Sequence, residues 1–252
     1  MKLTKIITIS AITLIALGTT TSVLAADGGT YKSTGSIEFT PSTDTTKPTD
    51  PTDPTKPVEP INPGGETPDP GTAGPLSIDF VSSVSFGKNK ITNKDVTYFA
   101  DPQKLVDGTE KPNYVQVTDT RGTNGGWILT VKQEGQLKNE TTTNKELTGA
   151  VLSFKDGKAV SAAMGVTAPS VNDVVLNPAG ASSTIMSAEK GAGALSWLDV
   201  FGTLEDETVE GESVQKNKAI TLEIPGTTPK DAVKYSTNLT WTLNDVPTSE
   251  VE

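Results

Sequence analysis

The sequence predicts an all-β fold: a sandwich-like antiparallel domain with a Pro-rich disordered insertion near the N-terminus. Short runs in which polar and apolar residues alternate follow one another beyond residue 75, as in half-buried strands. Turn signals separate these runs, among them Asn124-Gly125-Gly126, Asp156-Gly157 and Asn177-Pro178. No segment keeps a helical period over three turns, and the nearest candidate is 139–149. This pattern is typical of a β-sandwich.

The composition argues against several classes of protein. The chain has 252 residues. Roughly 180 remain once a leader and a low-complexity stretch are set aside, enough for one domain with a core. Cysteine and histidine are absent, so there is no disulfide framework, thiolate metal site, cysteine nucleophile or histidine base. Acidic residues outnumber basic ones by 31 to 21, which argues against nucleic acid as a partner.

The first 25 residues have the pattern of a secretory signal peptide. Lys2 and Lys5 precede an apolar run over 6–17, and small residues lead to a cleavage site after Ala25, with Ala26 as the alternative. The apolar run is short for a membrane span, and no second run follows it. We therefore expect a secreted protein that is not embedded in a membrane.

Residues 26–40 predict an N-terminal strand of the domain. In the alternating run 31–40 (YKSTGSIEFT), Tyr31, Ile37 and Phe39 fall on one face. Its core, Ser36-Ile37-Glu38-Phe39, is echoed by Ser77-Ile78-Asp79-Phe80 further along the chain. We expect two neighbouring strands of one sheet with an insertion between them. A leader strand outside the domain is the alternative.

Residues 41–75 form a Pro-rich segment that holds ten of the 17 prolines. From Pro48 to Pro63 a proline recurs at every third residue, which is the period of a polyproline II helix. Such a chain extends by about 3.1 Å per residue, on the order of 100 Å for the whole segment. We therefore predict a spacer or projecting loop. Recognition by a proline-binding groove of another protein is the alternative.

The rest of the chain carries the remaining predicted strands. The clearest is 219–225, where Ile220, Leu222 and Ile224 alternate with polar residues. The predicted strands are 76–86, 96–100, 114–119, 126–134, 150–154, 171–176, 183–188, 218–224 and 234–243.

Two of these strands carry the pattern Trp-x-Leu, at Trp127 to Leu129 and at Trp241 to Leu243. In each, Trp and Leu share one face of the strand because they are two residues apart. Indole rings can stack on sugar rings, so paired tryptophans on a β surface could contact a glycan. The alternative is that both tryptophans fill the core of the sandwich, as buried aromatic residues commonly do. Trp197 lies outside both motifs and is interpreted as another strand residue.

The spacing of the two motifs, and the context LTWTLNDVP (239–247) of the second, resemble the WxL-domain surface proteins of Gram-positive bacteria. That family has one Trp-x-Leu in mid-domain and another near the C-terminus, followed by Asp and Pro, here Asp245 and Pro247. The resemblance implies a secreted protein bound non-covalently at the cell surface to peptidoglycan or another wall glycan. The signature and possible wall-binding residues are then Trp127, Leu129, Trp241 and Leu243.

The resemblance also implies surface assemblies with membrane-anchored partners, associated with adhesion. Two roles therefore stay open: direct wall binding, or a protein-protein interaction module retained indirectly through such a partner. Residues 248–252 show no sorting motif, so we expect non-covalent retention. The expected organisation is a signal peptide over 1–25, an N-terminal strand over 26–40, a Pro-rich spacer or loop over 41–75 and a WxL-type β domain over 76–252.

No group of residues in the sequence indicates catalysis or metal binding. The acidic run Glu205-Asp206-Glu207, with Glu210 and Glu212, lacks the alternation and glycine of a calcium loop, so we expect a solvated loop, with Ca²⁺ binding as the alternative. Neither a Gly-x-Ser-x-Gly elbow nor a phosphate-binding loop is present, and no carboxylate pair stands out as that of a glycosidase. We therefore expect a non-enzymatic protein without cofactor or metal site.

Overall fold

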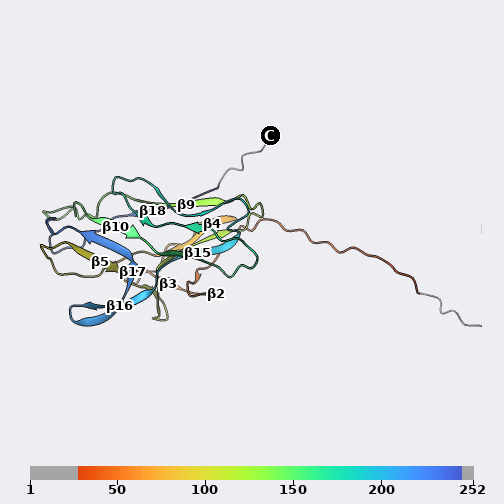
Figure 1. Cartoon of the computed structure of the whole chain (residues 1–252), viewed down its shortest axis with the longest axis horizontal. Coiled ribbons are helices and arrows are strands. Elements are labelled where there is room, and N and C mark those ends of the chain that lie inside the picture. Colours follow the sequence, from red (N-terminus) through yellow and green to blue (C-terminus); the bar gives the residue numbers. More distant parts are fainter. Residues whose placement is uncertain (1–27, 246–252) are drawn as a thin grey trace, which may run out of the picture. The chain divides into compact units, whose positions relative to one another are not determined.

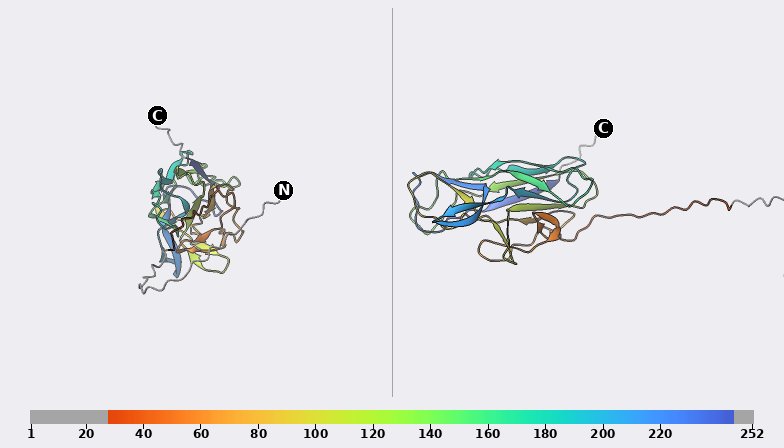
Figure 2. Two further views of the ribbon diagram at one scale, coloured as in Figure 1. Left: turned by 90° about the vertical axis from the view of Figure 1, so that its right-hand side faces the viewer. Right: turned by 60° about the horizontal axis from the view of Figure 1, so that its bottom comes forward.

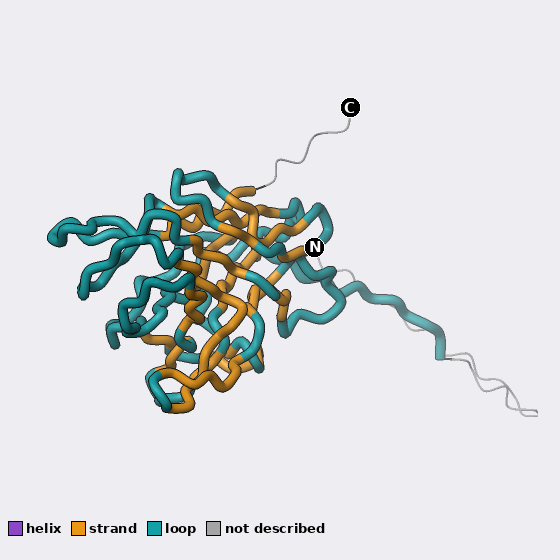
Figure 3. Tube along the Cα trace, turned by 60° about the vertical axis from the view of Figure 1, so that its left-hand side comes forward, coloured by secondary structure: helices purple, strands orange, loops and turns teal. Residues whose placement is uncertain are grey.

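The computed structural model describes residues 28–245. The regular secondary structure of these residues consists of β-strands, and they contain no helix (Figures 1 and 3). Every pairing between these strands is antiparallel, which confirms the predicted all-β antiparallel fold. The chain divides into two units, the first ending at Glu38 and the second beginning at Phe39. The predicted signal peptide lies outside the described residues.

The second unit contains all the described strands, and most of them are short. They are β1 (Thr49–Asp50), β2 (Asp53–Pro57), β3 (Pro60–Ile61), β4 (Leu76–Val81), β5 (Val96–Ala100), β6 (Gln103–Leu105), β7 (Glu110–Lys111), β8 (Tyr114–Asp119), β9 (Trp127–Gln133), β10 (Val151–Phe154), β11 (Gly157–Val160), β12 (Ser170–Val171), β13 (Val174–Val175), β14 (Ser183–Ala188), β15 (Leu195–Phe201), β16 (Leu204–Val209), β17 (Glu212–Ile224) and β18 (Leu239–Asp245).

Three larger sheets build the body of this unit (Figure 2). Their strand orders are β11-β15-β8-β4, β12-β14-β9-β18 and β13-β10-β17-β16, with β5 also paired to β17. Alternate residues of these strands point to a common core, since successive side chains of a strand lie on opposite faces. Fully buried members of this core come from all three sheets, for example Val117, Leu129 and Ile220. The two small sheets, β1-β2 and β3-β6-β7, lie within residues 49–111.

β8 is buried on both faces, which explains a second, smaller core. Val115 and Val117 face the main core, whereas Tyr114 packs with Phe80, Leu198 and Val200 on the other side. The rings of Phe80 and Tyr114 are 4.8 Å apart between centroids. A sheet that carries apolar residues on both faces needs a covering layer on each, because exposed aromatic and aliphatic surface is unfavourable in water.

The Pro-rich segment provides polar contacts on this second face of β8, and here the structure differs from the sequence-based expectation. Instead of a disordered spacer, the segment contains β1, β2 and β3. The buried side chain of Gln116 holds it in place: its Oε1 accepts from the Thr49 amide at 2.8 Å, and its Nε2 donates to the Lys47 carbonyl at 3.0 Å and to Asp79 at 2.9 Å. Pro51 is buried as well. The proline period alone does not show that these polar groups on β8 bind the segment.

Residues 28–40 contain no strand, although an N-terminal strand was predicted over 26–40. Tyr31, Ile37 and Phe39 are 93%, 78% and 84% exposed. The second half of the sequence echo, 77–80, does form a strand, β4, which pairs with β8. The alternation in 31–40 therefore has the side-chain pattern of a strand, but the structure forms no strand from these residues.

A buried carboxylate on β15 is the most unusual polar group of the unit. Asp199 has no exposed surface, and neither of its carboxylate oxygens has a hydrogen-bond partner among residues 28–245. Burial therefore raises the pKa of Asp199 to about 7, because desolvation disfavours the charged form. Gly157 on the neighbouring strand leaves the room that this carboxylate occupies, since a Cβ there would lie 2.6 Å from Asp199 Oδ1.

Candidate functional site: the paired Trp-x-Leu strands

The two Trp-x-Leu motifs lie on neighbouring strands, which the sequence alone does not show. β9 and β18 pair antiparallel with Trp241 opposite Val131, Leu243 opposite Leu129, and Asp245 opposite Trp127. The two motifs therefore run in opposite directions along one ladder, and their apolar side chains share the inner face of the sheet.

The first motif is entirely inside the protein. Trp127 and Leu129 are 0% exposed, so packing explains this half of the signature. The indole Nε1 of Trp127 donates to the Gly193 carbonyl at 3.0 Å. Residue 193 has to be glycine, because its φ is +69° and a Cβ would lie 2.4 Å from the Cβ of Ala188. A buried indole is thus fitted closely and has its one donor satisfied.

The second motif is only half-buried. Trp241 and Leu243 pack against the main core, and the Trp241 ring meets Phe154 edge to face, with 6.0 Å between centroids and 84° between planes. Their remaining exposure has a simple cause: β18 ends its sheet, and only β9 pairs with it among residues 28–245. A contact of Trp241 and Leu243 with a wall polymer stays a prediction, whereas the burial of Trp127 and Leu129 leaves them no accessible surface for one.

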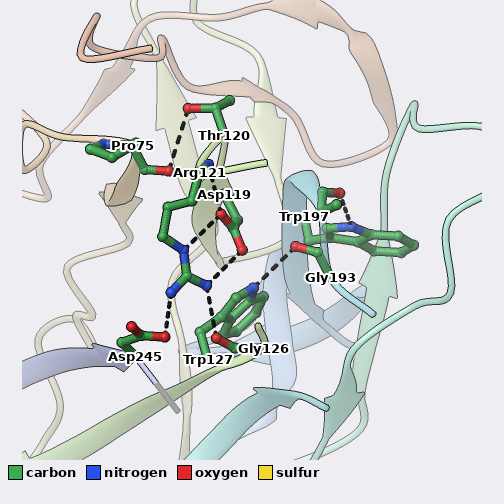
Figure 4. A network of polar contacts seen from close by, with 10 residues as sticks. Pro75, Asp119, Thr120, Arg121, Gly126, Trp127, Gly193, Trp197 and Asp245 are labelled. Atoms are coloured by element: carbon green, nitrogen blue, oxygen red, sulfur yellow. Dashed lines mark hydrogen bonds and ion pairs between the residues drawn. The ribbon is translucent and has the colours of Figure 1, made fainter. Parts of the chain in front are cut away.

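An arginine joins the ends of the two motifs (Figure 4). Arg121 donates from Nε and Nη2 to the two oxygens of Asp119, at 3.0 and 2.8 Å, and from Nη2 to the Gly126 carbonyl at 2.8 Å. Its Nη1 donates to Asp245, two residues before the motif context ends at position 247. Gly126 directly precedes Trp127, so one guanidinium links the start of the first motif to the end of the second.

We call Asp119, Arg121, Gly126 and Asp245 the Arg121 cluster. Its two ion pairs differ in environment: the Asp119 side chain is 3% exposed and the Asp245 side chain 64%. The hydrogen bonds to Asp119 raise the pKa of Arg121 above its already high usual value, so the guanidinium stays charged at any relevant pH. The cluster gives the Asp of the distal motif a structural role, as the outer ligand of a mostly buried arginine.

The sequence-based prediction missed Arg121, although a signal for it was present. It is the only arginine of the chain, and it stands six residues before Trp127. A planar guanidinium that binds two carboxylates and a carbonyl cannot be replaced by a lysine without losing part of this geometry. A lone arginine among many lysines therefore indicates a position where the fork of donors is needed.

A polar groove lies at the other end of the β9-β18 ladder. It has a volume of about 480 Å³ and is lined by residues of two loops, 134–141 and 234–238. The loops are tied together by the backbone pair of Lys138 and Ser236 and by the amide of Asn139, which donates to the Lys234 carbonyl at 2.8 Å. Hydroxyl, amide and charged groups dominate its lining: Glu134, Lys138, Asn139, Glu140, Thr141, Lys234, Ser236, Thr237 and Asn238.

The acidic run lies elsewhere, on the hairpin of β16 and β17. There Lys218 pairs with Glu207 at 2.9 Å and with Glu205 at 3.5 Å, so part of the negative charge is neutralised across the strands. Within residues 28–245, no group of three acidic side chains is placed to hold a metal ion. The run forms a charged edge strand, a common protection against unwanted strand pairing.

These features define a class: an antiparallel β-sandwich in which two Trp-x-Leu strands pair side by side and an arginine joins their ends. Residues 26–247 match the family described as WxL domain surface cell wall-binding. The chain therefore belongs to this family and is a secreted, cell wall-associated protein. Comparisons with curated proteins and with solved structures gave no match. Among the described residues, no helix is long and apolar enough to cross a membrane.

Proposed function

We propose that this protein binds peptidoglycan directly and non-covalently, and that the polar groove at the end of the β9-β18 ladder contacts the wall polymer. Family membership establishes wall association, but the first motif is buried and cannot supply the contact. The groove is the observation that supports the proposal, because its hydroxyl, amide and charged side chains can exchange hydrogen bonds with glycan hydroxyls or stem-peptide amides.

The net charge of the protein limits how such binding can work. The whole chain carries 21 basic and 31 acidic residues. Removal of residues 1–25 takes away Lys2 and Lys5 and no acid, which leaves 19 basic residues against 31 and a formal charge of −12. A polyanionic wall repels such a protein at long range, so affinity has to come from short-range contacts, from bridging divalent cations or from a second protein.

The groove can be tested with residues that support little else. Lys138 and Asn238 are both exposed, and Lys138 makes a surface ion pair with Glu140 at 2.8 Å, the kind of pair that contributes little to stability. We expect the double variant Lys138→Ala/Asn238→Ala of residues 26–252 to remain folded by circular dichroism and to lose most of its binding to purified, protein-free peptidoglycan. The matched control is Lys56→Ala, which removes a lysine from another exposed ion pair, on β2, outside the groove. Wild-type binding by the folded double variant would refute the groove as the contact.

We propose that the protein acts on the wall by binding it and not by catalysis. Its groove holds Glu134 and Glu140, but Lys132 pairs with the first at 3.2 Å and Lys138 with the second at 2.8 Å. Hydrogen bonding to Lys138 lowers the pKa of Glu140, which is the opposite of what a general acid needs. Release of soluble fragments from purified wall by the wild-type protein would contradict this part of the proposal.

A second candidate function is a protein-protein interaction module retained through a membrane-anchored partner, within a surface adhesion complex. The exposed edge of β18 favours it, because an unpaired edge strand is a common docking site for another chain. Protein-free peptidoglycan separates the two functions: a module that is retained only through a partner does not bind it.

A further inference from the structure

The segment 234–238 forms one wall of the polar groove, and the facing loop holds its backbone in place. Ser236 and Lys138 exchange both of their backbone hydrogen bonds, at 3.0 and 2.8 Å. The Asn238 carbonyl accepts from the Glu134 amide at 2.9 Å. These are antiparallel ladder contacts, so this wall runs as an extended chain beside the other loop.

The side chains of this wall alternate between the groove and the protein interior, as they do in an extended chain. Lys234, Ser236 and Asn238 are exposed and line the groove. Tyr235 and Thr237, which lie between them, are half-buried, and their hydroxyls donate to backbone carbonyls of the protein. The three exposed side chains make no hydrogen bond or ion pair within residues 28–245, so their donors are available to a ligand.

Lys234 differs from the other charged residues that line the groove. Lys132 pairs with Glu134 at 3.2 Å, and Lys138 pairs with Glu140 at 2.8 Å, so both glutamates of the lining have a cationic partner. Among residues 28–245, the Lys234 ammonium has no carboxylate partner. A cation without a partner in a polar groove favours a ligand with an anionic group, because an ammonium bonds a carboxylate more strongly than it bonds a neutral acceptor.

The spacing of the three donors fits an extended peptide. Side chains two residues apart in an extended chain are about 7 Å apart, so ammonium, hydroxyl and amide follow one another over roughly 13 Å. A second extended peptide beside this wall repeats its polar groups at the same interval. The ligand that these observations describe is a peptide with a free carboxylate and hydrogen-bonding amide groups.

We propose that the groove recognises the stem peptide of peptidoglycan, with Lys234 pairing with a free carboxylate of that peptide and with Ser236 and Asn238 bonding its amide groups. This inference rests on the proposed function, since it names the part of the wall polymer that the groove contacts. A glycan strand offers hydroxyl and acetamide groups, but its lactyl carboxylates are consumed wherever they carry stem peptides. The glycan alone therefore leaves the Lys234 ammonium without an anion.

The proposed ion pair is compatible with weak dependence of binding on salt. Added salt weakens the single contact of Lys234 and also screens the repulsion between the wall and a protein with 19 basic and 31 acidic residues after removal of residues 1–25. The second effect offsets the first, because it involves the charge of the whole protein.

Chemical capping of the wall carboxylates tests the pairing. Carbodiimide and glycinamide convert the free carboxylates of purified peptidoglycan to neutral amides and leave the glycan strands intact. We expect wild-type 26–252 to bind the capped polymer about five- to tenfold more weakly than the untreated polymer, the upper range for a partly shielded ion pair. Equal or tighter binding of wild type to the capped polymer overturns the inference and leaves the proposed function standing. Absence of binding to untreated peptidoglycan refutes the proposed function itself.

Substitution of Lys234 shows whether this residue is the one that senses the carboxylates. Lys234→Ala should bind untreated peptidoglycan about five- to tenfold more weakly than wild type and should lose nothing more on capping, because it has no ammonium to pair. Lys234→Arg keeps the charge and should retain most of the affinity. A folded Lys234→Ala that still loses affinity on capping, as wild type does, would show that the carboxylates act elsewhere and would overturn the inference.

The matched control is Lys190→Ala. Lys190 is also exposed and has no ion pair within residues 28–245, but its loop lies at the opposite end of β9, where Ala188 stands opposite Trp127. This variant should bind both polymers as wild type does. Circular dichroism should show all the variants folded, since neither lysine side chain makes a polar contact in the described structure.

Competition distinguishes the stem peptide from the glycan as the source of the contact. An amidase that cleaves between the lactyl group and the peptide gives soluble stem peptides and soluble glycan strands, which can be separated. We expect the peptides to displace wild-type 26–252 from intact peptidoglycan and the glycan strands to leave it bound. Displacement by the glycan strands and not by the peptides would assign the groove to the glycan and overturn the inference.

Discussion

Removal of the Arg121 side chain tests the structural role that we assign to the cluster between the two motifs. In Arg121→Ala, the carboxylate of Asp119 stays 3% exposed and loses both side-chain hydrogen bonds from the guanidinium. The carbonyl of Gly126 loses its donor as well. Breaking a buried ion pair by removing one partner costs about 3–5 kcal/mol, a large part of the roughly 5–15 kcal/mol that stabilises a typical domain.

The expected cost can be separated from that of the outer ion pair. Asp245→Asn changes a partner whose side chain is 64% exposed, and such pairs contribute about 0–1 kcal/mol. Arg121→Lys keeps the charge but cannot reach Asp119, Asp245 and Gly126 at once, so we expect a value between those of the other two variants. In a domain of this size, the alanine variant should melt roughly 6–20 °C below wild type.

Thermal and urea unfolding of the three variants, monitored by far-UV circular dichroism, measures these differences. The reasoning predicts the order Arg121→Ala, then Arg121→Lys, then Asp245→Asn, from the most to the least destabilised. If the free energy of unfolding of Arg121→Ala lies within about 1 kcal/mol of that of Asp245→Asn, the buried ion pair does not hold the two motifs together, and the role assigned to Arg121 is wrong.

Three further perturbations follow from the fold. The pKa of Asp199 is raised from 3.8 to about 7, so the native state binds a proton more tightly than the unfolded chain and stability falls as pH rises through this window. Asp199→Asn should therefore be more stable than wild type by on the order of 4 kcal/mol at pH 8 and by little at pH 4; equal urea midpoints at pH 8 would contradict this. Gly193→Ala places a Cβ 2.4 Å from the Cβ of Ala188 at a residue with positive φ. It should lower the free energy of unfolding, measured with urea, by about 2–4 kcal/mol. An unchanged free energy would mean that the packing around Trp127 is loose. Gln116→Ala removes the hydrogen bonds to Thr49 and Lys47, and should speed up hydrogen exchange at the Thr49 amide, with exchange at the wild-type rate as the contrary result.

Several strands could be predicted from the sequence because apolar and polar residues alternate along them, even in β8, whose polar face is also buried. β5, β8 and β14 have the predicted bounds, and β9 differs by one residue at each end. β16 was not predicted as a strand, and of β15 only Trp197 was interpreted as a strand residue, with no bounds given. β15 is buried over most of its length and so lacks alternation, while β16 is an acidic edge strand whose composition resembles a loop.

The candidate site was predictable only in part. The resemblance identified the Trp-x-Leu residues, but their packing depends on strand pairing between residues more than 100 positions apart, 127–133 with 239–245. The same long-range pairing brings Asp245 to Arg121, so neither local propensity nor spacing could reveal the Arg121 cluster. The contacts of the Pro-rich segment with Gln116 likewise depend on which face of β8 needs a cover.

The most direct test of the central claim is the binding isotherm of residues 26–252 on purified, protein-free peptidoglycan at low and high salt. Residues 26–252 carry a net charge of −12, from 19 basic and 31 acidic residues. If short-range contacts hold the protein on the wall, binding should be unchanged or stronger when NaCl rises from about 0.05 to 0.5 M. Absence of binding by the folded protein, or a steep loss of affinity with added salt, would contradict direct recognition of the wall polymer.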